Sequence, residues 1–346
     1  MNEILCIFTD PHLRSNNIDS VTKVIEEGIA LCVKKDIADM VCLGDVFDSR
    51  VSQRQDVLTA WDNILEKFDK SGITLHCLRG NHDSTDYESF KSFLTPYKYH
   101  PNFNLIDDIA ETRINGKTFY WIAYYSEQKW LERYNELIKE GIKKDSILFS
   151  HIAVQGSVNN DGTKVQSTIK PSLFKSFKRV YLGHYHNSQE IGTNIFHLGS
   201  LQQNNFGEDP DKGFWILTEN GNVELVQSSC GQQYKKLVIN LDEVDHKKAT
   251  SMIKKFKESN SDCRLRVELT GESAAVKAFD GTSFPGIDVK KKYKEVEEVE
   301  VEEEASGVEK ASFDDIVIKF KKFCEEHEYE YEEGIKILKK AHDGRN

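Results

Sequence analysis

Five short polar blocks recur along the first 190 residues, and each follows directly on an apolar, β-branched run. Runs of this kind predict buried strands, so each block is expected at the end of a strand. Within three of the blocks, Gly44, Gly80 and Gly183 allow sharp turns that bring the backbone close to a bound group. The chain is therefore predicted to gather polar side chains at one edge of a sheet. The blocks are Asp10-Pro11-His12, Gly44-Asp45-Val46-Phe47-Asp48, Gly80-Asn81-His82-Asp83, the isolated His151, and Gly183-His184-Tyr185-His186.

The residue types in these blocks are those that bind divalent metal ions. Two ions held about 3.5–4 Å apart can bind a phosphate diester, activate water and stabilise charge on the attacking and leaving oxygens. Bridging two ions requires a carboxylate, and Asp45 is the natural candidate. Histidine, aspartate and one amide oxygen suit Mn²⁺ or Fe²⁺ better than Mg²⁺, which prefers oxygen ligands and retained water. The blocks thus predict a pair of divalent ions, with Mn²⁺ favoured.

In order and spacing the blocks resemble the motifs of the calcineurin-like metallophosphoesterases, which are DxH, GDxxD, GNH(D/E), H and GHxH. The resemblance implies an α/β fold, a metallophosphoesterase β-sandwich flanked by helices. It also implies a complete ligand set for two ions. These ligands are Asp10, His12 and His186 for one ion, Asn81, His151 and His184 for the other, and Asp45 as the bridge.

The same resemblance implies catalytic roles for two residues outside the ligand set. In this superfamily the histidine at the position of His82 contacts the scissile phosphate and assists the leaving group. Asp48, three residues after the bridge, is placed to orient that histidine. An anionic partner would hold the imidazole in one tautomer and keep it protonated, as a general acid requires. His82 and Asp48 are therefore the predicted catalytic residues.

Each motif taken alone has a simpler explanation, because a lone DPH or GHYH occurs by chance in many chains. Five blocks in order, each after a strand-like run, make chance a poor explanation for the whole set. The remaining histidines lack such a setting and are predicted to be structural or solvated. They include His76, His100, His197 and His246.

A narrower resemblance follows the last block. Residues 197–214 contain a Gly-Ser pair, then Phe206-Gly207-Glu208, then Asp211-Lys212-Gly213-Phe214, and are similar to the closing segment of the SbcD family of DNA nuclease subunits. This resemblance implies a metal-dependent exonuclease or endonuclease acting on DNA in repair and recombination, in a compact version such as bacteriophages carry. Arg14 departs from the family pattern, which usually has glycine there, so the substrate contacts of that loop are left open.

Four regions are predicted along the 346 residues. Alternating strands and helices in the first 190 residues indicate an α/β sandwich, and the length suits one large domain with accessories. A later strand, helix and strand predict a β-α-β unit that is similar to the small α+β capping domain of SbcD-type proteins. The regions are a nuclease domain at 1–228, a capping, DNA-binding domain at 229–288, a charged linker at 289–311 and a helical tail at 312–346.

Apolar periodicity locates the main elements. Arg264 and Arg266 lie on one face of the last predicted strand, which suits contact with a phosphate backbone, although a solvated face is the simpler alternative. The predicted helices cover residues 19–36, 52–71, 85–95, 125–141 and 245–259, and the strands of the second domain cover 233–240 and 264–269.

The tail after the acidic linker carries an apolar stripe that begins at Phe313 and includes Phe320 and Phe323. Such a stripe either packs back on the nuclease domain or binds a partner helix. The SbcD resemblance implies that residues 312–341 bind the coiled coil of an SbcC-type ATPase, and that the nuclease forms a homodimer. No P-loop motif is present, so ATP hydrolysis must come from another chain.

The acidic charge of the chain argues against strong DNA binding by this protein alone. The formal net charge is −11, and non-specific duplex binding depends largely on neutralising phosphates. Bound metals offset the charge locally, and a basic partner could supply the rest. The same charge suits a phosphatase or nucleotide phosphodiesterase on this fold, which is the first alternative. A scaffold that lost its metals is a second, which the complete ligand set disfavours.

Nothing in the sequence predicts a membrane or secreted protein. No run of 18 or more apolar residues occurs, and the first residues lead into a strand-like run without a basic region or cleavage site. The seven cysteines are scattered and lie mostly in apolar runs, which is typical of reduced core thiols. We therefore expect a cytoplasmic protein, in the host cytoplasm if a phage encodes it.

Overall fold

The computed structural model describes residues 3–139, 141–159 and 162–293, with isolated residues between 317 and 335. The chain divides into two compact units, Met1–Lys294 and Glu295–Asn346. Most of the predicted charged linker, from residue 294 to 311, and most of the predicted helical tail at 312–346 lie outside the described residues. The proposed partner segment, 312–341, therefore stays a prediction.

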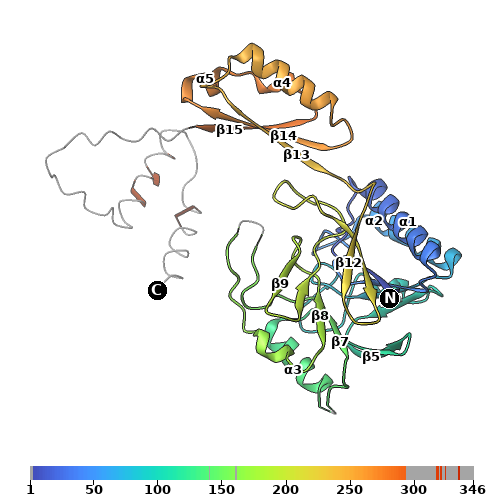
Figure 1. The fold of residues 1–346 in the computed structure, drawn as a ribbon. Coiled ribbons are helices and arrows are strands. Elements are labelled where there is room, and N and C mark those ends of the chain that lie inside the picture. Colours follow the sequence, from blue (N-terminus) through green and yellow to red (C-terminus); the bar gives the residue numbers. More distant parts are fainter. Residues whose placement is uncertain are drawn as a thin grey trace. The chain divides into compact units, whose positions relative to one another are not determined.

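Two six-stranded sheets make up the predicted β-sandwich (Figure 1). The first has the order β12 (Val223–Gln227), β11 (Gly213–Thr218), β1 (Glu3–Phe8), β2 (Asp39–Cys42), β3 (Thr74–Leu78), β4 (Phe103–Ile106). The second has the order β5 (Ile109–Ile114), β6 (Lys117–Ile122), β7 (Ile147–Ser150), β8 (Arg179–Leu182), β10 (Ile195–His197), β9 (Gln189–Ile191). Strands β1 to β4 run parallel, as do β6, β7, β8 and β10.

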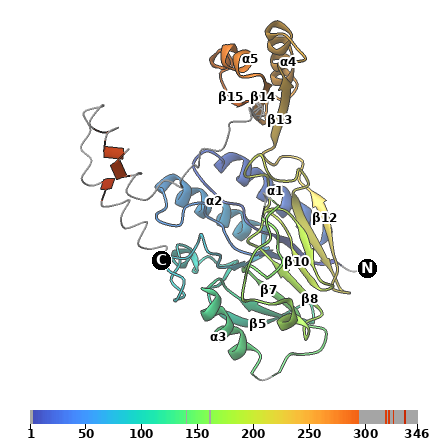
Figure 2. The same cartoon turned by 90° about the vertical axis from the view of Figure 1, so that its left-hand side faces the viewer.

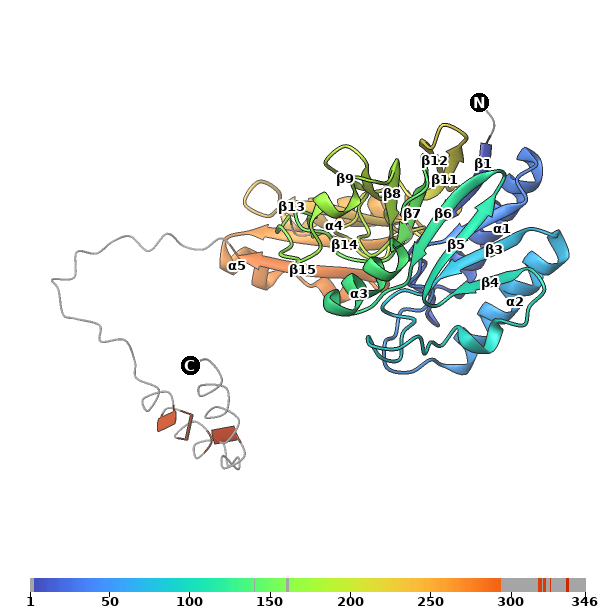
Figure 3. The ribbon, with the colours of Figure 1, turned by 90° about the horizontal axis from the view of Figure 1, so that it is seen from below.

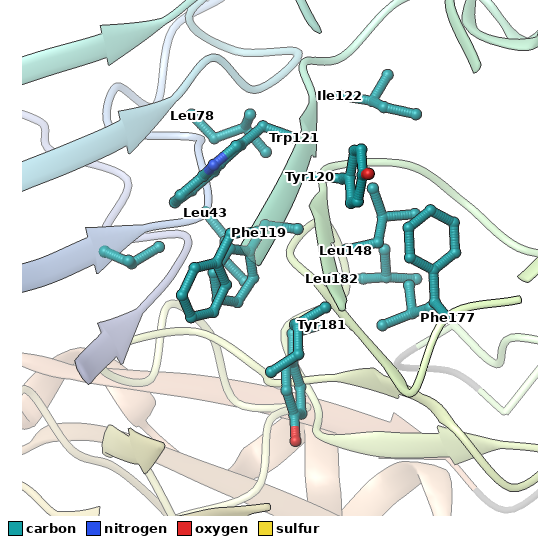
Figure 4. Close-up of a cluster of buried hydrophobic side chains, with 14 of the residues drawn as sticks. Leu43, Leu78, Phe119, Tyr120, Trp121, Ile122, Leu148, Phe177, Tyr181 and Leu182 are labelled. Carbon is teal, nitrogen blue, oxygen red and sulfur yellow. The ribbon is translucent and has the colours of Figure 1, made fainter. Parts of the chain in front are cut away.

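Aromatic side chains fill the space between the two sheets (Figure 4). The rings of Phe119 and Phe149 stack at 5.2 Å between centroids, and Trp121 lies 4.7 Å from Phe149. Leu43 and Leu78 contribute from the first sheet's side of the same cluster. Each such side chain contributes roughly 1.5–3 kcal/mol by burial. The packed core therefore holds the ends of both sheets at a fixed separation.

Helices cover the outer faces of the sandwich. Helix α1 (Ile18–Lys35) and helix α2 (Gln55–Ser71) lie side by side on the first sheet (Figure 2), and both bury an apolar face with residues such as Val24 and Trp61. Helix α3 (Glu127–Leu137) packs Trp130 against the second sheet. These three helices agree with the sequence prediction to within four residues at each end. None of the described helices is long and apolar enough to cross a bilayer.

The helix predicted at residues 85–95 is wrong. This stretch forms bends, followed by a short 3-10 turn at Thr95–Tyr97. The Asp86 carboxylate accepts hydrogen bonds from the backbone N–H groups of Glu88 and Ser89, at 3.0 and 2.7 Å. Side-chain oxygens of Asp and Ser compete in this way with helical hydrogen bonds. The result is a loop that follows the GNHD block.

A separate three-stranded parallel sheet forms after β12 (Figure 3). The predicted strands and helix appear within two residues of their expected bounds, as β13 (Tyr234–Asn240), α4 (His246–Glu258) and β14 (Arg264–Gly271). The sequence missed α5 (Ser273–Ala278) and β15 (Ile287–Tyr293). The linker boundary at residue 289 is consequently wrong, because Val289 pairs with Val267 and packs against this sheet's core.

Candidate metal centre

All seven predicted ligands converge at one edge of the sandwich. They follow the ends of β1, β2, β3, β7 and β8, as the sequence pattern predicted. Five of the side chains are buried, with Asp10 and His151 at 0% exposure and Asn81 at 1%, and His184 and His186 are half-buried. Buried carboxylates and imidazoles of this kind require compensating partners or bound ions. The edge is thus a compact polar centre inside an apolar frame.

Three groups of ligand-type side chains form within the centre, each with its atoms within 4.8 Å of one another. Two of them share no residue, and the third, His12, Asp45 and His82, connects these two. Asp45 Oδ2 lies 3.3 Å from His151 Nε2 and 3.8 Å from His12 Nε2, so this carboxylate lies between the two groups. The two groups without a common residue contain six of the seven ligands that the sequence resemblance implied, and the seventh, Asn81, lies beside the second group. One group is Asp10, His12 and His186, and the other is Asp45, His151 and His184.

The donor atoms of both groups point toward one another. His151 Nδ1 donates to the Leu43 carbonyl at 2.7 Å, so its Nε2 atom faces Asn81 Oδ1 at 3.0 Å. In the other group, His12 Nε2 and His186 Nε2 lie 2.9 Å apart. Lone pairs this close repel unless a cation or shared protons lie between them, and nitrogen and oxygen donors suit divalent ions such as Mn²⁺. The residues therefore fit two divalent ions.

Backbone geometry at the centre is unusual. Asp10, His12, Asp45 and His184 have φ values of 52°, 45°, 53° and 89°, in the left-handed region. They are four of the seven non-glycine residues with positive φ in the described part of the chain. Such conformations cost roughly 1–3 kcal/mol each and cluster at functional sites. The strained backbone at these four residues thus directs their side chains toward the centre.

The three glycines of the blocks act in two different ways. Gly44 adopts a φ of +96°, which only glycine reaches easily. Gly80 and Gly183 are needed for close approach instead. A Cβ atom on Gly80 would lie 2.2 Å from Asp45 Oδ1, and one on Gly183 would lie 2.5 Å from Thr9 Oγ1. An alanine at either Gly80 or Gly183 would therefore collide with atoms of the centre.

Charge coupling is strong within the centre. Burial alone lowers the pKa of His151, but the adjacent Asp45 carboxylate outweighs it and raises that pKa to about 9. Burial and the charge of His151 lower the pKa of His184 to about 3. Burial and the Asp45 charge raise the pKa of Asp83 to about 7. The negative charge of Asp45 thus attracts positive charge to the middle of the centre.

The structure corrects the predicted contact between Asp48 and His82. His82 Nδ1 lies 2.5 Å from the backbone carbonyl oxygen of Asp48, and the Asp48 carboxylate faces other groups. Asp48 Oδ1 lies 3.5 Å from Arg14 Nη1 and 3.8 Å from His12 Nδ1. A neutral carbonyl still selects the tautomer of the imidazole. The Asp48 carboxylate is therefore not the partner of His82 among the described contacts, and the carboxylate near its Nε2 atom is that of Asp45, at 3.9 Å.

Sequence reasoning assigned no role to two further side chains at the centre. Arg50 Nη2 and Nε lie 2.9 and 3.0 Å from His82 Nε2, the ring nitrogen that would face a bound phosphate. Tyr124 stacks on the His184 ring at 6.0 Å between centroids. The position of Arg50, two residues after Asp48, is a sequence signal that could have found it. Tyr124 carries no such signal, because it lies far from any block.

Arg14, the departure from the family pattern, connects the centre to the three-stranded sheet. Its Nη2 atom donates to the Tyr234 hydroxyl and to the Asn204 carbonyl, each at 3.3 Å. Phe206 packs edge-on against the Tyr234 ring at 4.9 Å between centroids, and the Arg266 guanidinium lies 4.0 Å above the Phe206 ring. The first strand of the smaller sheet thus contacts the loop that follows His12.

The other histidines lie in polar contacts away from the ligand groups. His76 pairs with Asp39 at 2.8 Å, and His100 lies between Asp62 and Asp69. His197 donates to the Gly183 carbonyl at 2.9 Å, and His246 contacts the Ala275 carbonyl at 3.0 Å. None of these four belongs to a ligand group among the described residues.

A comparison with known families agrees with this geometry. The family model for the calcineurin-like phosphoesterases matches residues 5–212, which is more than half of the chain. The chain belongs to the calcineurin-like phosphoesterase family. This membership confirms the fold class and the family that the sequence motifs predicted. It identifies the protein as a phosphoesterase, for which a two-ion centre is the appropriate chemistry.

Two viral proteins and one solved structure illustrate what the chain is similar to. The chain is 29% identical over 217 residues to putative phosphoesterase 244L of Invertebrate iridescent virus 6, covering 61% of this chain and 74% of that one. It is 27% identical over 231 residues to exonuclease subunit 1 of Enterobacteria phage T4, covering 64% and 63%. A dimetal phosphatase from Danio rerio superposes with a TM-score of 0.41 at 12% identity, covering 61% and 91%.

Proposed function

We propose that this phosphoesterase is a nuclease that hydrolyses DNA phosphodiester bonds, as the SbcD-type subunit of a DNA repair and recombination complex. The match to the phage protein named exonuclease subunit 1 supports this assignment. The closing segment at residues 197–214, with its Phe206-Gly207-Glu208 sequence, supports it as well. The chain spans 63% of that relative, so the relative's activity is carried over here as part of the proposal.

The observation that carries the proposal is the open face of the three-stranded sheet. Strand alternation and register place five basic and two acidic side chains on the face opposite α4 and α5, a net of three positive charges. This face contacts the metal-site loop through Tyr234 and Arg14. A duplex backbone needs a basic surface of this kind beside the reacting phosphate. The charged residues are Lys236, Arg264, Arg266, Lys290, Lys292, Glu268 and Asp288.

The chemistry follows from the positions of the side chains. Two divalent ions, with Mn²⁺ favoured, would be held by the seven ligands and would supply Lewis acidity and an activated water. The Nδ1 atom of His82 is held by the Asp48 carbonyl, and its Nε2 atom accepts a hydrogen bond from Arg50 Nε. When protonated on both ring nitrogens, His82 would suit proton donation from Nε2 to the leaving oxygen. Arg50 lies beside the same nitrogen and can contact a phosphate oxygen.

The proposal also includes partners. We expect residues 312–341 to bind a separate SbcC-type coiled-coil ATPase and the chain to form a homodimer. The net charge of −11 supports the need for a basic partner in tight DNA binding. A phosphatase acting on small phosphate esters remains the alternative, and the iridescent virus relatives are named only as phosphoesterases.

A substrate comparison with two charge variants tests the assignment. The Mn²⁺-loaded protein should degrade linear duplex DNA and act poorly on p-nitrophenyl phosphate. Lys236→Ala with Lys290→Ala, on the open face, should weaken DNA binding and reduce the slope of affinity against salt. Lys254→Ala with Lys255→Ala on α4 removes the same charge from the covered side and should change little. Rapid phosphomonoester hydrolysis without DNA cleavage would favour the phosphatase.

A further inference from the structure

The closing segment reaches the metal centre through a buried carboxylate. Glu208 has a fully buried side chain, and its Oε1 atom accepts a hydrogen bond from His186 Nδ1 at 2.7 Å. The ammonium group of Lys212, four residues later, donates a hydrogen bond to the backbone carbonyl of the same histidine. Both contacts come from a segment more than 20 residues away in sequence. His186 is thus held at its ring and at its backbone by one segment.

The two carboxylate oxygens of Glu208 accept hydrogen bonds from different donors. Oε1 receives His186 Nδ1 and the Asn205 amide, each at 2.7 Å. Oε2 receives the Ser200 hydroxyl at 3.0 Å and the Asn204 backbone N–H at 2.9 Å. A buried carboxylate is stable only when such donors satisfy it. The loop contacts therefore fix the carboxylate, and the carboxylate in turn fixes the imidazole.

We propose that Glu208 is a positioning residue for the metal ligand His186. Because Nδ1 must carry the hydrogen that Glu208 accepts, Nε2 is left as a lone pair directed at His12 and Asp10. A carboxylate behind a ligating imidazole fixes its tautomer and ring orientation and raises its basicity. The ion of the Asp10, His12 and His186 group should therefore depend on Glu208, and the other ion should not. This proposal rests on the two-ion centre of the proposed function, and not on DNA as the substrate.

Two variants of Glu208 and one matched control test it. Glu208→Ala removes the acceptor, and Glu208→Gln keeps an acceptor oxygen of the same reach without the charge. Asp209→Asn removes an equal charge from the neighbouring exposed position. Mn²⁺ affinity measured by calorimetry should fall about 10- to 100-fold at one of two sites in Glu208→Ala. Glu208→Gln should recover part of that loss, and Asp209→Asn should bind both ions normally.

A spectroscopic measurement separates positioning from loop structure. In metal-free protein, nitrogen-15 spectra of the imidazoles should show His186 with its hydrogen on Nδ1, and Glu208→Ala should shift it to a mixture of tautomers. Ser200→Ala removes the hydroxyl contacts to Oε2 and to the Gln202 carbonyl but none to Oε1, and should leave that tautomer unchanged.

Two results would overturn the proposal. One is an unchanged His186 tautomer in Glu208→Ala, and the other is a Glu208→Gln protein with the metal affinities of Asp209→Asn. The second comparison also decides the matter if Glu208→Ala fails to fold. None of these measurements depends on DNA cleavage. If the proposed nuclease function is wrong but the role of Glu208 is right, the wild-type protein will bind two ions normally and will not cleave DNA.

Discussion

At the residue scale, the chemistry of the centre depends on which atom of each side chain is engaged. Three imidazoles have one ring nitrogen held by a fixed partner: the Leu43 carbonyl for His151, Glu208 for His186, and the Asp48 carbonyl for His82. Each partner selects a tautomer and therefore decides which nitrogen faces the ions or the phosphate.

Substitution of His82 should separate metal binding from catalysis. His82→Ser should retain two ions while turnover falls about 10²- to 10⁴-fold, the usual contribution of a general acid. Asp48→Asn should have a much smaller effect, because the His82 contact comes from the Asp48 backbone. Metal analysis and single-turnover kinetics check both variants. An empty metal site in His82→Ser would instead make this histidine a ligand.

At the element scale, the ends of neighbouring strands approach each other closely. The turn after β3 brings Gly80 against the turn after β2, with no room for a side chain between Gly80 and Asp45. The hydrogen bond from the His82 backbone N–H to Asp45 Oδ1, at 2.8 Å, crosses the same contact. The position of the bridging carboxylate is thus decided by two adjacent strand ends.

Gly80→Ala should disable the centre while the fold survives. The added methyl group must displace Asp45, since it would lie 2.2 Å from Oδ1, and a shift of about 1 Å can cost about 10² in rate. Overpacking of this kind destabilises by roughly 1–3 kcal/mol. Gly116→Ala, in the open β5–β6 turn at a φ of +77°, strains the backbone without meeting another atom and is the control for destabilisation away from the centre. Normal activity in Gly80→Ala would show that the turn tolerates rearrangement.

The end of β10 should make the protein sensitive to acid. Burial lowers the pKa of His197 to about 4, against 6.5 as the ordinary value, although its hydrogen bond to Gly183 opposes the shift. Between these pH values the unfolded chain binds more protons at this site than the folded protein. The free energy of unfolding therefore falls as the pH drops from 6.5 toward 4.

His197→Asn should reduce this sensitivity. Between pH 7 and pH 4.5 the wild-type protein should lose about 2 kcal/mol more stability than the variant. Denaturant unfolding in the presence of a chelator measures the difference without interference from metal binding. Equal losses in both proteins would mean that His197 titrates normally in the folded state.

At the scale of the whole molecule, one segment joins the two folded parts of Met1–Lys294. Gln202 and Gln203 accept hydrogen bonds from the backbone N–H groups of Gln232 and Tyr234, at 3.0 and 2.9 Å. Glu208 lies in the same segment and contacts His186. The closing segment therefore supports the start of the smaller sheet and a metal ligand together.

Removal of the tail tests whether catalysis and partner binding reside in different parts of the chain. A protein truncated after Val308 should remain folded, because it keeps the whole compact unit Met1–Lys294, and should keep the Mn²⁺-dependent DNA cleavage that we propose. It should no longer co-purify with the ATPase that we expect as a partner. Phe320→Glu with Phe323→Glu in the full chain should have the same effect on co-purification. Undiminished complex formation by that double variant would place the partner site elsewhere, most plausibly on the smaller domain.

The sequence by itself determined the family and the residues that gather at the centre. Metal-type side chains after buried strands leave few alternatives, because parallel strand ends must share an edge and only these side chains suit ions. Long amphipathic helices such as α1 and α2 were equally predictable from their period. The local information in such segments is sufficient, since their burial and their hydrogen bonds follow from nearby residues.

Tertiary structure alone decided the contacts between distant segments. The Asp48 carboxylate faces Arg14 and the Asp48 carbonyl faces His82. The backbone conformation after β2 decides which of these two groups contacts His82. Glu208 reaches His186 only because the closing segment folds back over the end of β8. The helix expected at residues 85–95 was lost to side-chain hydrogen bonds around Asp86. Hydrogen bonds between residues far apart in sequence leave no periodic signal, so only the folded chain reveals them.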